Sequence, residues 1–422
     1  MAWLRLPFGA LGRGTLVVTV GLWSRALLQG LYLVLASRWL EASGYGLFSG
    51  SASAIVLFAP LANLGMGFVF TDYAARRNIS LSVLWSQVLR LSWLSTILIA
   101  LVVVILAVLV LPVRLGPVAM ALIAVSELIA VPLIAVASAA LITKGRAGSA
   151  ATAVGLVPAV RCAGILALMV ADAAASVQLL VAVHCLGSAC VAVWALRLTR
   201  GTLAENDPSP SGKLPSDGRM LKDGFYYALG NTVGISYSEV DKVFMLQALG
   251  AETTGNYTVA FRVVAVLALP ISALLSSATP RLFAEHHTGA GRRVLKAVVA
   301  SGLCYALVAG AMVLLLAPMM PLVFGVSYIT SSHLASLLSA WLPLSVLHVC
   351  GSIALVTSGR KALRLTVESV GMALIIVLNV LLLPCLGAEG AITALLSGEC
   401  LMSAGCWFAY FACRNDQAEQ TK

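Results

Sequence analysis

Basic residues stand inside long apolar stretches of the chain, where a positive charge needs a partner, water or a ligand. There are four of them, namely Arg25, Arg161, Lys242 and Arg262. Guanidinium binds anions through paired donors and stays charged in apolar surroundings. Arg25 and Arg262 have no acidic residue three or four positions away. We therefore predict that Arg25 and Arg262 bind an anionic ligand, with Arg161 and Lys242 as further candidates.

Two of these charges also have a plainer interpretation. Lys242 has Glu239 three residues before it and Asp241 directly beside it, which favours a local ion pair. Arg161 has no acidic partner in its own stretch, so a salt bridge to another helix stays open beside a ligand contact. The sequence alone does not decide between these roles.

Uncharged polar residues accompany the charges. The candidates for lining a polar cavity are Gln29, Tyr32, Asn63, Tyr227, Asn231 and Ser238. The first two follow Arg25 at i+4 and i+7, which gives one helix a polar stripe. The last three share a helix face at i, i+4 and i+11. Hydrogen bonding between helices is the alternative role for Asn63, Tyr227, Asn231 and Ser238.

Acidic residues inside the apolar stretches suggest cation coupling, and Glu127 and Asp241 are the candidate carriers of a proton or sodium ion. No motif for catalysis is present, since the chain has no Walker sequence, no GxGxxG after a strand and no HExxH. The nine cysteines form no CxxC pair and are interpreted as packing residues. We predict no catalytic residue, no metal and no cofactor beyond a proton or sodium gradient.

Composition predicts which kind of secondary structure contains these residues. The chain is 60% hydrophobic and only 10% charged, with a mean hydropathy of +0.98, which predicts an integral membrane protein. Because lipid offers no water to backbone groups, the spans should be helices. Windows of about 20 apolar residues predict twelve transmembrane helices, over residues 14–36, 45–70, 89–112, 117–142, 148–171, 175–196, 224–248, 255–280, 295–318, 331–357, 365–386 and 389–412.

Lysine and arginine in the predicted loops fix the orientation. Nearly all lie on one face, against Arg38 and Arg114 on the other. Positive loops face the cytoplasm, so both termini are predicted to be cytoplasmic. The net charge of +10 therefore reflects topology, and we predict no nucleic-acid partner.

Prolines indicate an internal repeat. Pairs about 210 residues apart are Pro60 with Pro270, Pro112 with Pro321, and Pro132 with Pro343. We predict an all-α fold of two six-helix lobes, related by a pseudo-twofold axis along the membrane normal. The expected lobes are residues 1–197 and 223–413, with a cytoplasmic linker over 198–222 and a cytoplasmic tail over 414–422.

Three segments carry a family resemblance that spans nearly the whole chain. They read SRWLEASGYGLFSGSASAIVLFAPLANLGMG, DKVFMLQALGAETTGNYTVAFRVVAVLALPISALLSSATPRLF and NVLLLPCLGAEGAITALLSGE. The sequence resembles the polysaccharide-transporter (O-antigen flippase) branch of the multidrug/oligosaccharidyl-lipid/polysaccharide exporter superfamily. These motifs indicate the superfamily more sharply than the substrate.

The resemblance implies a flippase in the bacterial inner membrane for an undecaprenyl-diphosphate-linked oligosaccharide, such as an O-antigen, capsule or exopolysaccharide repeat unit. In that family a cationic cavity lined by helices 1, 2, 7 and 8 takes the diphosphate, and Arg25 and Arg262 fall on two of these helices. The expected partners are the lipid-linked oligosaccharide, membrane lipids, a polysaccharide polymerase and a chain-length regulator.

Two other classes compete with this interpretation. A cation-coupled multidrug or small-molecule antiporter of the same superfamily is the alternative function. A polymerase or glycosyltransferase would be an enzyme with a long outer loop bearing carboxylates or arginines, and the predicted outer loops are only a few residues long. We therefore expect a transporter and not an enzyme.

Overall fold

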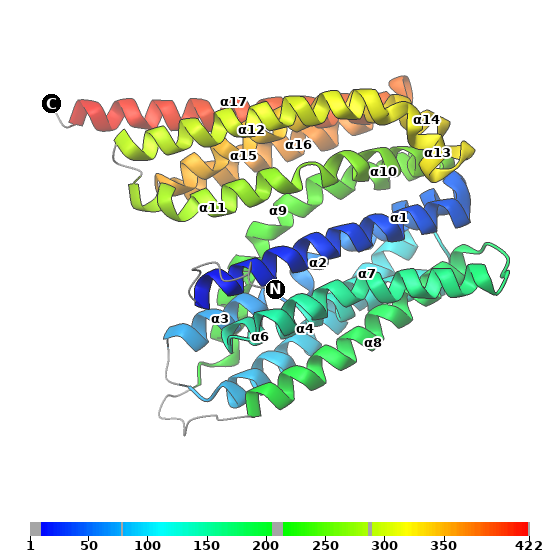
Figure 1. The fold of residues 1–422 in the computed structure, drawn as a ribbon, viewed down its shortest axis with the longest axis horizontal. Coiled ribbons are helices and arrows are strands. Elements are labelled where there is room, and N and C mark those ends of the chain that lie inside the picture. Colours follow the sequence, from blue (N-terminus) through cyan, green and yellow to red (C-terminus); the bar gives the residue numbers. More distant parts are fainter. Residues whose placement is uncertain (1–9, 77–78, 205–213, 286–288, 421–422) are drawn as a thin grey trace, which may run out of the picture. The chain divides into compact units, whose positions relative to one another are not determined.

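The structure, a computed structural model, describes residues 10–76, 79–204, 214–285 and 289–420 (Figure 1). Within these residues the chain is helical and contains no strand. Helices close every internal backbone hydrogen bond without water, which lipid requires. The predicted all-α membrane fold is confirmed.

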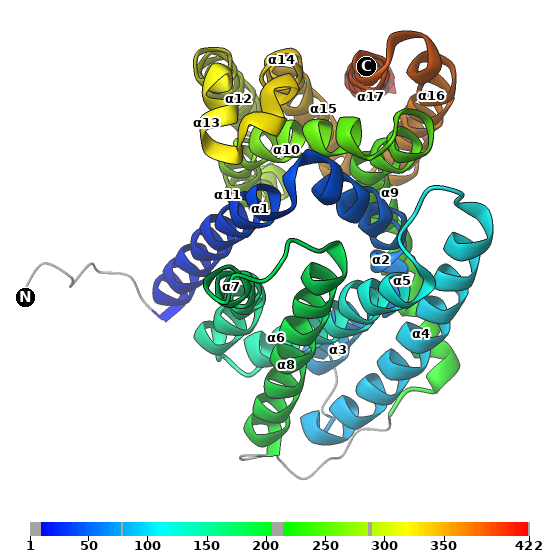
Figure 2. The ribbon, with the colours of Figure 1, turned by 90° about the vertical axis from the view of Figure 1, so that its right-hand side faces the viewer.

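The described residues of the first half form nine helical elements. They are α1 (Ala10–Val56), α2 (Ala59–Ala62), α3 (Met66–Arg76), α4 (Leu81–Val110), α5 (Pro117–Ala124), the π-helix η1 (Val125–Ala130), α6 (Val131–Thr143), α7 (Ala147–Val170) and α8 (Val177–Ala204). Figure 2 shows α7 and α8 side by side, and the two helices contact each other extensively.

The second half begins with α9 and ends with α17. Its elements are α9 (Asp217–Leu249), α10 (Ala251–Val266), α11 (Leu269–Glu285), α12 (Gly289–Leu316), η2 (Ala317–Met319), α13 (Met320–Phe324), η3 (Val326–Tyr328), α14 (Ile329–Leu338), α15 (Trp341–Thr357), α16 (Lys361–Leu386) and α17 (Ala388–Gln420).

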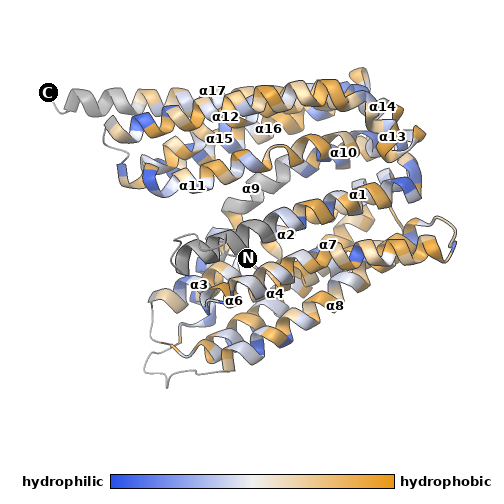
Figure 3. Cartoon of the chain, viewed as in Figure 1, coloured by the Kyte–Doolittle hydropathy of each residue, from blue (hydrophilic) through white to orange (hydrophobic). Residues whose placement is uncertain are grey.

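Length and apolarity identify eight membrane-spanning helices in the described part of the chain, or nine when α14 and α15 are joined across their 45° bend. Apolar residues run along these helices in Figure 3. The remaining three predicted windows, 14–36, 45–70 and 224–248, lie on α1 to α3 and on α9. Each of the twelve predicted spans thus coincides with helical structure.

The predicted span over residues 45–70 is not one continuous helix. Pro60 lies in the first turn of α2, where its missing N–H does least harm, and the chain breaks again at Leu64 and Gly65, which both have positive φ. Asn63 compensates this second break. Its side-chain oxygen accepts the Gly65 N–H at 3.2 Å, and its amide nitrogen donates to the Pro132 carbonyl at 3.2 Å.

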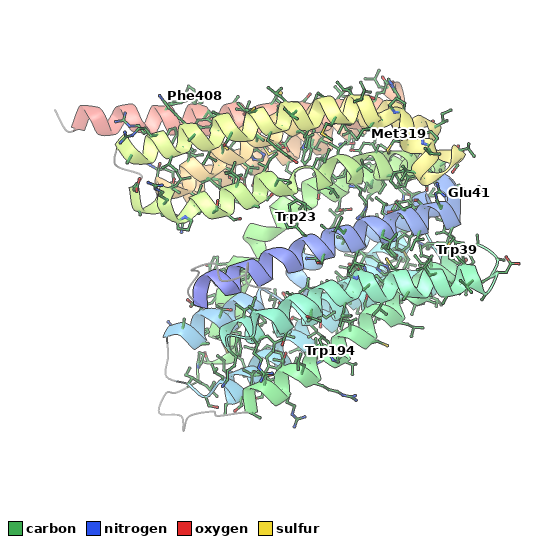
Figure 4. All side chains as sticks on the ribbon, viewed as in Figure 1. Trp23, Trp39, Glu41, Trp194, Met319 and Phe408 are labelled. Atoms are coloured by element: carbon green, nitrogen blue, oxygen red, sulfur yellow. The ribbon has the colours of Figure 1, made fainter. Side chains whose placement is uncertain are left out.

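The backbone carries the predicted internal repeat. Glu41, labelled in Figure 4, interrupts α1 with φ 56° and ψ −177°. Gly250 precedes α10 with φ 84° and ψ −178°. These two positions lie about 210 residues apart, the spacing of the proline pairs. The same turn therefore recurs at corresponding places in the two halves, and Glu41 adopts it although this region favours glycine.

Contacts divide the chain into two compact units. Unit 1 comprises Met1–Leu40 and Ser51–Glu239, and unit 2 comprises Glu41–Gly50 and Val240–Lys422. The first part of α9 thus packs with unit 1, where Tyr73 donates to Asp223 at 2.7 Å. Arg90 forms an ion pair with Asp217 at 2.6 Å. The lobe and linker boundaries inferred from the sequence stay predictions.

Within unit 2, the short segment 41–50 packs across α10, and two glycines form the contact. A Cβ on Gly46 would lie 1.7 Å from the Ala251 carbonyl oxygen, and a Cβ on Gly255 would lie 2.0 Å from the Ala42 carbonyl oxygen. The two contacts are reciprocal, because each glycine meets the residue that lies four positions before the other. Only residues without a side chain allow backbones to approach this closely.

Ser49 and Thr258 continue the reciprocal crossing. Their positions differ by 209 residues, and Ser49 Oγ donates to Thr258 Oγ1 at 3.2 Å. Both residues are buried. The repeat is therefore visible in side-chain contacts as well as in the backbone.

Replacing Gly46 with alanine should destabilise the protein, because the new methyl group meets backbone that cannot move aside as a side chain would. We expect a loss of about 3 kcal/mol, the upper end for overpacking. Gly155→Ala is the matched control, since nothing lies within 4 Å of its Cβ position. Thermal unfolding in detergent measures both variants, and equal melting temperatures for them would contradict the close crossing.

Candidate functional site

A buried ion pair joins two helices of unit 1. Arg161 on α7 is 5% exposed, and its Nη2 donates to Glu127 Oε1 at 2.7 Å. Glu127 lies in the π-helix η1, a form that is rare and often occurs at functional sites. Because both charges lie inside the helix bundle, each supplies the counter-charge of the other.

Two serines complete the coordination of Arg161. Ser188 Oγ lies 2.6 Å from Nη2 and 3.1 Å from Nε, and Ser126 Oγ lies 2.9 Å from Nη2. Both serines are fully buried. The guanidinium is therefore held by η1, α7 and α8 together, which favours a structural role. Its predicted role in binding substrate stays a prediction.

Histidine extends this group towards α1. His184 Nε2 lies 2.6 Å from Glu127 Oε1, and Tyr32 Oη lies 2.8 Å from His184 Nδ1. An ionised carboxylate only accepts, so we assign the hydrogen to Nε2, and Nδ1 then accepts from the tyrosine. Arg161 already balances the charge of Glu127, so charge balance requires no second proton on His184. Tyr32, predicted to line a cavity, is instead 3% exposed within this network.

Arg25 differs from Arg161 in its surroundings. Its side chain is exposed on α1 and makes no hydrogen bond or ion pair with any described residue. It lies within electrostatic range of Arg161 and Glu127. Gln29, one turn further along α1, is half-buried. Arg25 is therefore a cation that the described part of the protein leaves available to a ligand.

Lys242 lies in a second buried group, in unit 2. It is fully buried, with Nζ 3.4 Å from Asp241 Oδ1 and 4.3 Å from the centre of the Phe261 ring. Asp241 Oδ2 also accepts the hydroxyl of Tyr257. The predicted local ion pair is confirmed. Arg262, the next residue along α10, is half-buried.

The remaining candidate lining residues are scattered over different environments. Asn63 supports the break between α2 and α3. Tyr227 is 41% exposed and stacks on Phe68, with ring centroids 5.4 Å apart. Ser238 is half-buried. Asn231 lies in α9 outside the residues whose side chains are described. Their common role in a polar cavity stays a prediction.

Sequence reasoning missed a buried group on α15, α16 and α17. His348 Nδ1 lies 2.8 Å from Glu399 Oε2, and His348 Nε2 lies 3.7 Å from Glu368 Oε1. The other oxygen of Glu399 accepts the Trp341 Nε1 hydrogen at 3.0 Å. The available signal was a histidine inside an apolar window, which is uninformative until its partners are known. In the described part of the chain, no group of three or more histidine, cysteine or acidic residues fits a metal ion.

Removing the charge of Arg161 should destabilise the fold strongly. Arg161→Met leaves the Glu127 carboxylate buried without its cation, at a cost of about 3–5 kcal/mol. The double variant Arg161→Met, Glu127→Leu should recover most of this loss. Arg90→Met is the surface control, because Arg90 and Asp217 have side chains 66% and 45% exposed, and exposed pairs contribute at most about 1 kcal/mol. Chemical unfolding in detergent measures these differences, and a double variant as unstable as the single one would contradict the pairing.

Comparison with known families gives one match over most of the chain. The family described as polysaccharide biosynthesis protein matches residues 11–286. No curated protein sequence matches the chain significantly.

Solved transporter structures share the fold. An inward-facing multidrug resistance MATE family transporter of the MOP superfamily is 15% identical, with a TM-score of 0.70 over 93% of this chain and 96% of that one. The lipid II flippase MurJ, in an inward closed conformation, is 10% identical, with a TM-score of 0.68 over 93% and 87%. A MOP superfamily transporter from Pyrococcus furiosus is 15% identical, with a TM-score of 0.67 over 94% and 95%.

Proposed function

Because the chain belongs to the polysaccharide biosynthesis protein family, we propose that it is a flippase for an undecaprenyl-diphosphate-linked oligosaccharide. It has the fold of the MOP superfamily transporters and many membrane-spanning helices. The proposed reaction moves the saccharide headgroup from the cytoplasmic to the periplasmic leaflet by alternating access, with no covalent chemistry. An O-antigen, capsule or exopolysaccharide repeat unit is the proposed cargo.

The observation that carries this proposal is the environment of Arg25. It is an exposed guanidinium on an apolar helix with no hydrogen-bonding or ionic partner among the described residues. A diphosphate offers paired oxygens that match the donor geometry of guanidinium. Arg25 therefore suits the diphosphate that joins the lipid to the sugar.

Unlike Arg25, Arg161 and Lys242 form ion pairs inside the protein. Arg161 and Lys242 are both buried against carboxylates. They would therefore affect ligand binding by holding helices in position and through their electrostatic field. Arg262 stays the second proposed diphosphate ligand. In this proposal Arg25 makes the direct contact, and the Arg161 network holds α1 in place through Tyr32.

Location and partners follow from the proposed cargo. We place the protein in the bacterial inner membrane, with both termini in the cytoplasm, as the loop charges predict. The flipped product would be consumed by a polysaccharide polymerase acting with a chain-length regulator on the periplasmic side. A proton or sodium gradient is the proposed energy source, and Glu127 and Asp241 stay the carriers predicted from the sequence.

A cation-coupled multidrug or small-molecule antiporter is the second candidate function. The observation that favours it is that a multidrug resistance MATE transporter and MurJ resemble this fold almost equally, with TM-scores of 0.70 and 0.68. Such an antiporter takes its cargo without a diphosphate ligand, so the two candidates differ in their dependence on Arg25.

Arg25→Ala should slow the flipping of an undecaprenyl-diphosphate oligosaccharide. Loss of charge-assisted hydrogen bonds costs about 1.5–3 kcal/mol, which corresponds to roughly tenfold or more in affinity. Arg25→Lys should retain part of the activity. The measurement is the protection of a fluorescent lipid-linked saccharide from a membrane-impermeant quencher in proteoliposomes. Arg293→Ala, at an exposed arginine on α12, is the control and should leave the rate unchanged.

The same vesicles distinguish the two candidate functions. Wild-type protein that fails to flip the lipid-linked saccharide but transports ethidium against a cation gradient would establish the antiporter. A normal flipping rate in the Arg25→Ala variant would contradict the proposed contact between Arg25 and the diphosphate.

A further inference from the structure

We propose that His348, Glu399 and Glu368 form a proton-binding site inside unit 2, whose proton is exchanged through Glu368. The ligand of this site is the proton itself. The site deepens the proposed function, on which its role in transport rests, because it would supply the coupled cation. Its ability to bind a proton is independent of the cargo.

Position makes His348 the centre of the group. It lies on α15 with 6% of its surface exposed, between Glu399 of α17 and Glu368 of α16. Nδ1 is 2.8 Å from Glu399 Oε2. We take Glu399 as a carboxylate, which only accepts, and on that basis assign a hydrogen to Nδ1.

The surroundings of the second ring nitrogen, Nε2, indicate where His348 and Glu368 bind a proton. His348 Nε2 is buried, makes no hydrogen bond, and faces Glu368 Oε1 at 3.7 Å. If neither atom carried a hydrogen, two lone-pair acceptors would face each other away from water, which is costly. A proton on Nε2 removes this repulsion, because Oε1 already accepts hydrogen bonds from Arg364 Nε and Ser352 Oγ, both at 2.7 Å. The gap between these two atoms is therefore the place where a proton binds.

Charge balance gives the same result. Glu399 is fully buried, and its recorded ion pair is with His348. Glu368 forms an ion pair with Arg364 at 2.7 Å. Two carboxylates and one guanidinium leave one negative charge, and a proton on His348 neutralises it. Without that proton a buried carboxylate would lack a counter-charge, which is strongly unfavourable.

Among the described residues, the helices around α15 supply no further ion pair to His348, Glu368 or Glu399. On α17, Cys406 is buried near Glu368 and Arg364. The described parts of α11 and α12 also pack on α15 but form no recorded ion pair with His348, Glu368 or Glu399. The charged residues of these two helices are Arg281, Glu285, Arg292, Arg293 and Lys296.

Unit 1 provides an internal comparison. Its buried glutamate and histidine, Glu127 and His184, also join the fourth and sixth spans of the half, as His348 and Glu399 do in the second half. The residue types are exchanged between the two positions. In unit 1 the permanent cation Arg161 balances the carboxylate, so no proton on the histidine is required. The proton requirement is therefore specific to the group in unit 2.

Glu368 provides the route by which the proton leaves. In the exchange step the Nε2–H bond of His348 breaks, its electron pair stays on nitrogen, and a new O–H bond forms on Glu368 Oε1, which gives up one of the two hydrogen bonds that it accepts from Arg364 and Ser352. Glu368 has a side chain 13% exposed, and Arg364 beside it is 41% exposed in the first turns of α16. Once Glu368 releases the proton to water, Glu399 is buried without a counter-charge. Release is therefore linked to rearrangement of α15, α16 and α17.

Nitrogen-15 NMR of histidine-labelled protein in nanodiscs tests the site without any cargo. His348→Gln identifies the His348 signals. We expect both ring nitrogens of His348 to carry hydrogen at neutral pH in the wild type, and Glu399→Gln to shift the ring to its neutral form. His333→Gln is the matched control, since His333 pairs with Glu389 on the surface with side chains 60% and 57% exposed. A neutral His348 ring in the wild type would overturn the proposal.

Flipping in proteoliposomes tests the coupling. An imposed proton gradient should accelerate wild-type flipping, and the rates with and without the gradient should become equal in both His348→Gln and Glu399→Gln. His333→Gln should keep the acceleration. Acceleration that survives in both site variants would overturn the coupling. If the protein does not flip the lipid-linked saccharide but His348 carries hydrogen on both ring nitrogens, the proposed function is wrong and the proton-binding site is still supported.

Discussion

A polar group in the hydrocarbon region of a membrane finds no water, so its partner must come from the protein or from a ligand. This constraint explains why the described chain is helical and how its interruptions are built. The break between α2 and α3 persists because Asn63 accepts the Gly65 N–H at the break and donates to the Pro132 carbonyl of α6. The guanidinium of Arg161 is surrounded by Glu127, Ser126 and Ser188 for the same reason. Arg25 has no described partner, and the proposed contact with a diphosphate would supply one.

The two units satisfy this constraint differently. Each holds a glutamate and histidine pair, but only the pair in unit 1 includes a buried arginine. The permanent cation Arg161 balances the carboxylate in unit 1, whereas the proposed group in unit 2 reaches neutrality by taking up a proton. A repeated architecture can thus give one half a structural ion pair and the other a titratable one, through the identity of a few side chains.

Close backbone packing also holds unit 2 together. Segment 41–50 belongs to unit 2, where Gly46 and Gly255 let its backbone approach α10. Transmembrane helices gain little from the hydrophobic effect against one another, so close approach and interhelical hydrogen bonds hold them together. The reciprocal contacts and the bond between Ser49 and Thr258 show that this crossing follows the internal repeat.

The sequence by itself determined the fold class, the helical regions in which the spans lie and the repeat, and it favoured the local pair of Lys242 with Asp241. These features depend on apolar windows, on spacing along the chain and on neighbours in one helix, which are all local properties. Partners from other helices were decided only by the tertiary structure. His184 lies 57 residues from Glu127 and 152 from Tyr32, and His348 lies 51 from Glu399. Helical periodicity gives the face of a residue but not the helix that packs against it, so these buried groups emerged only once the helices were placed within each unit.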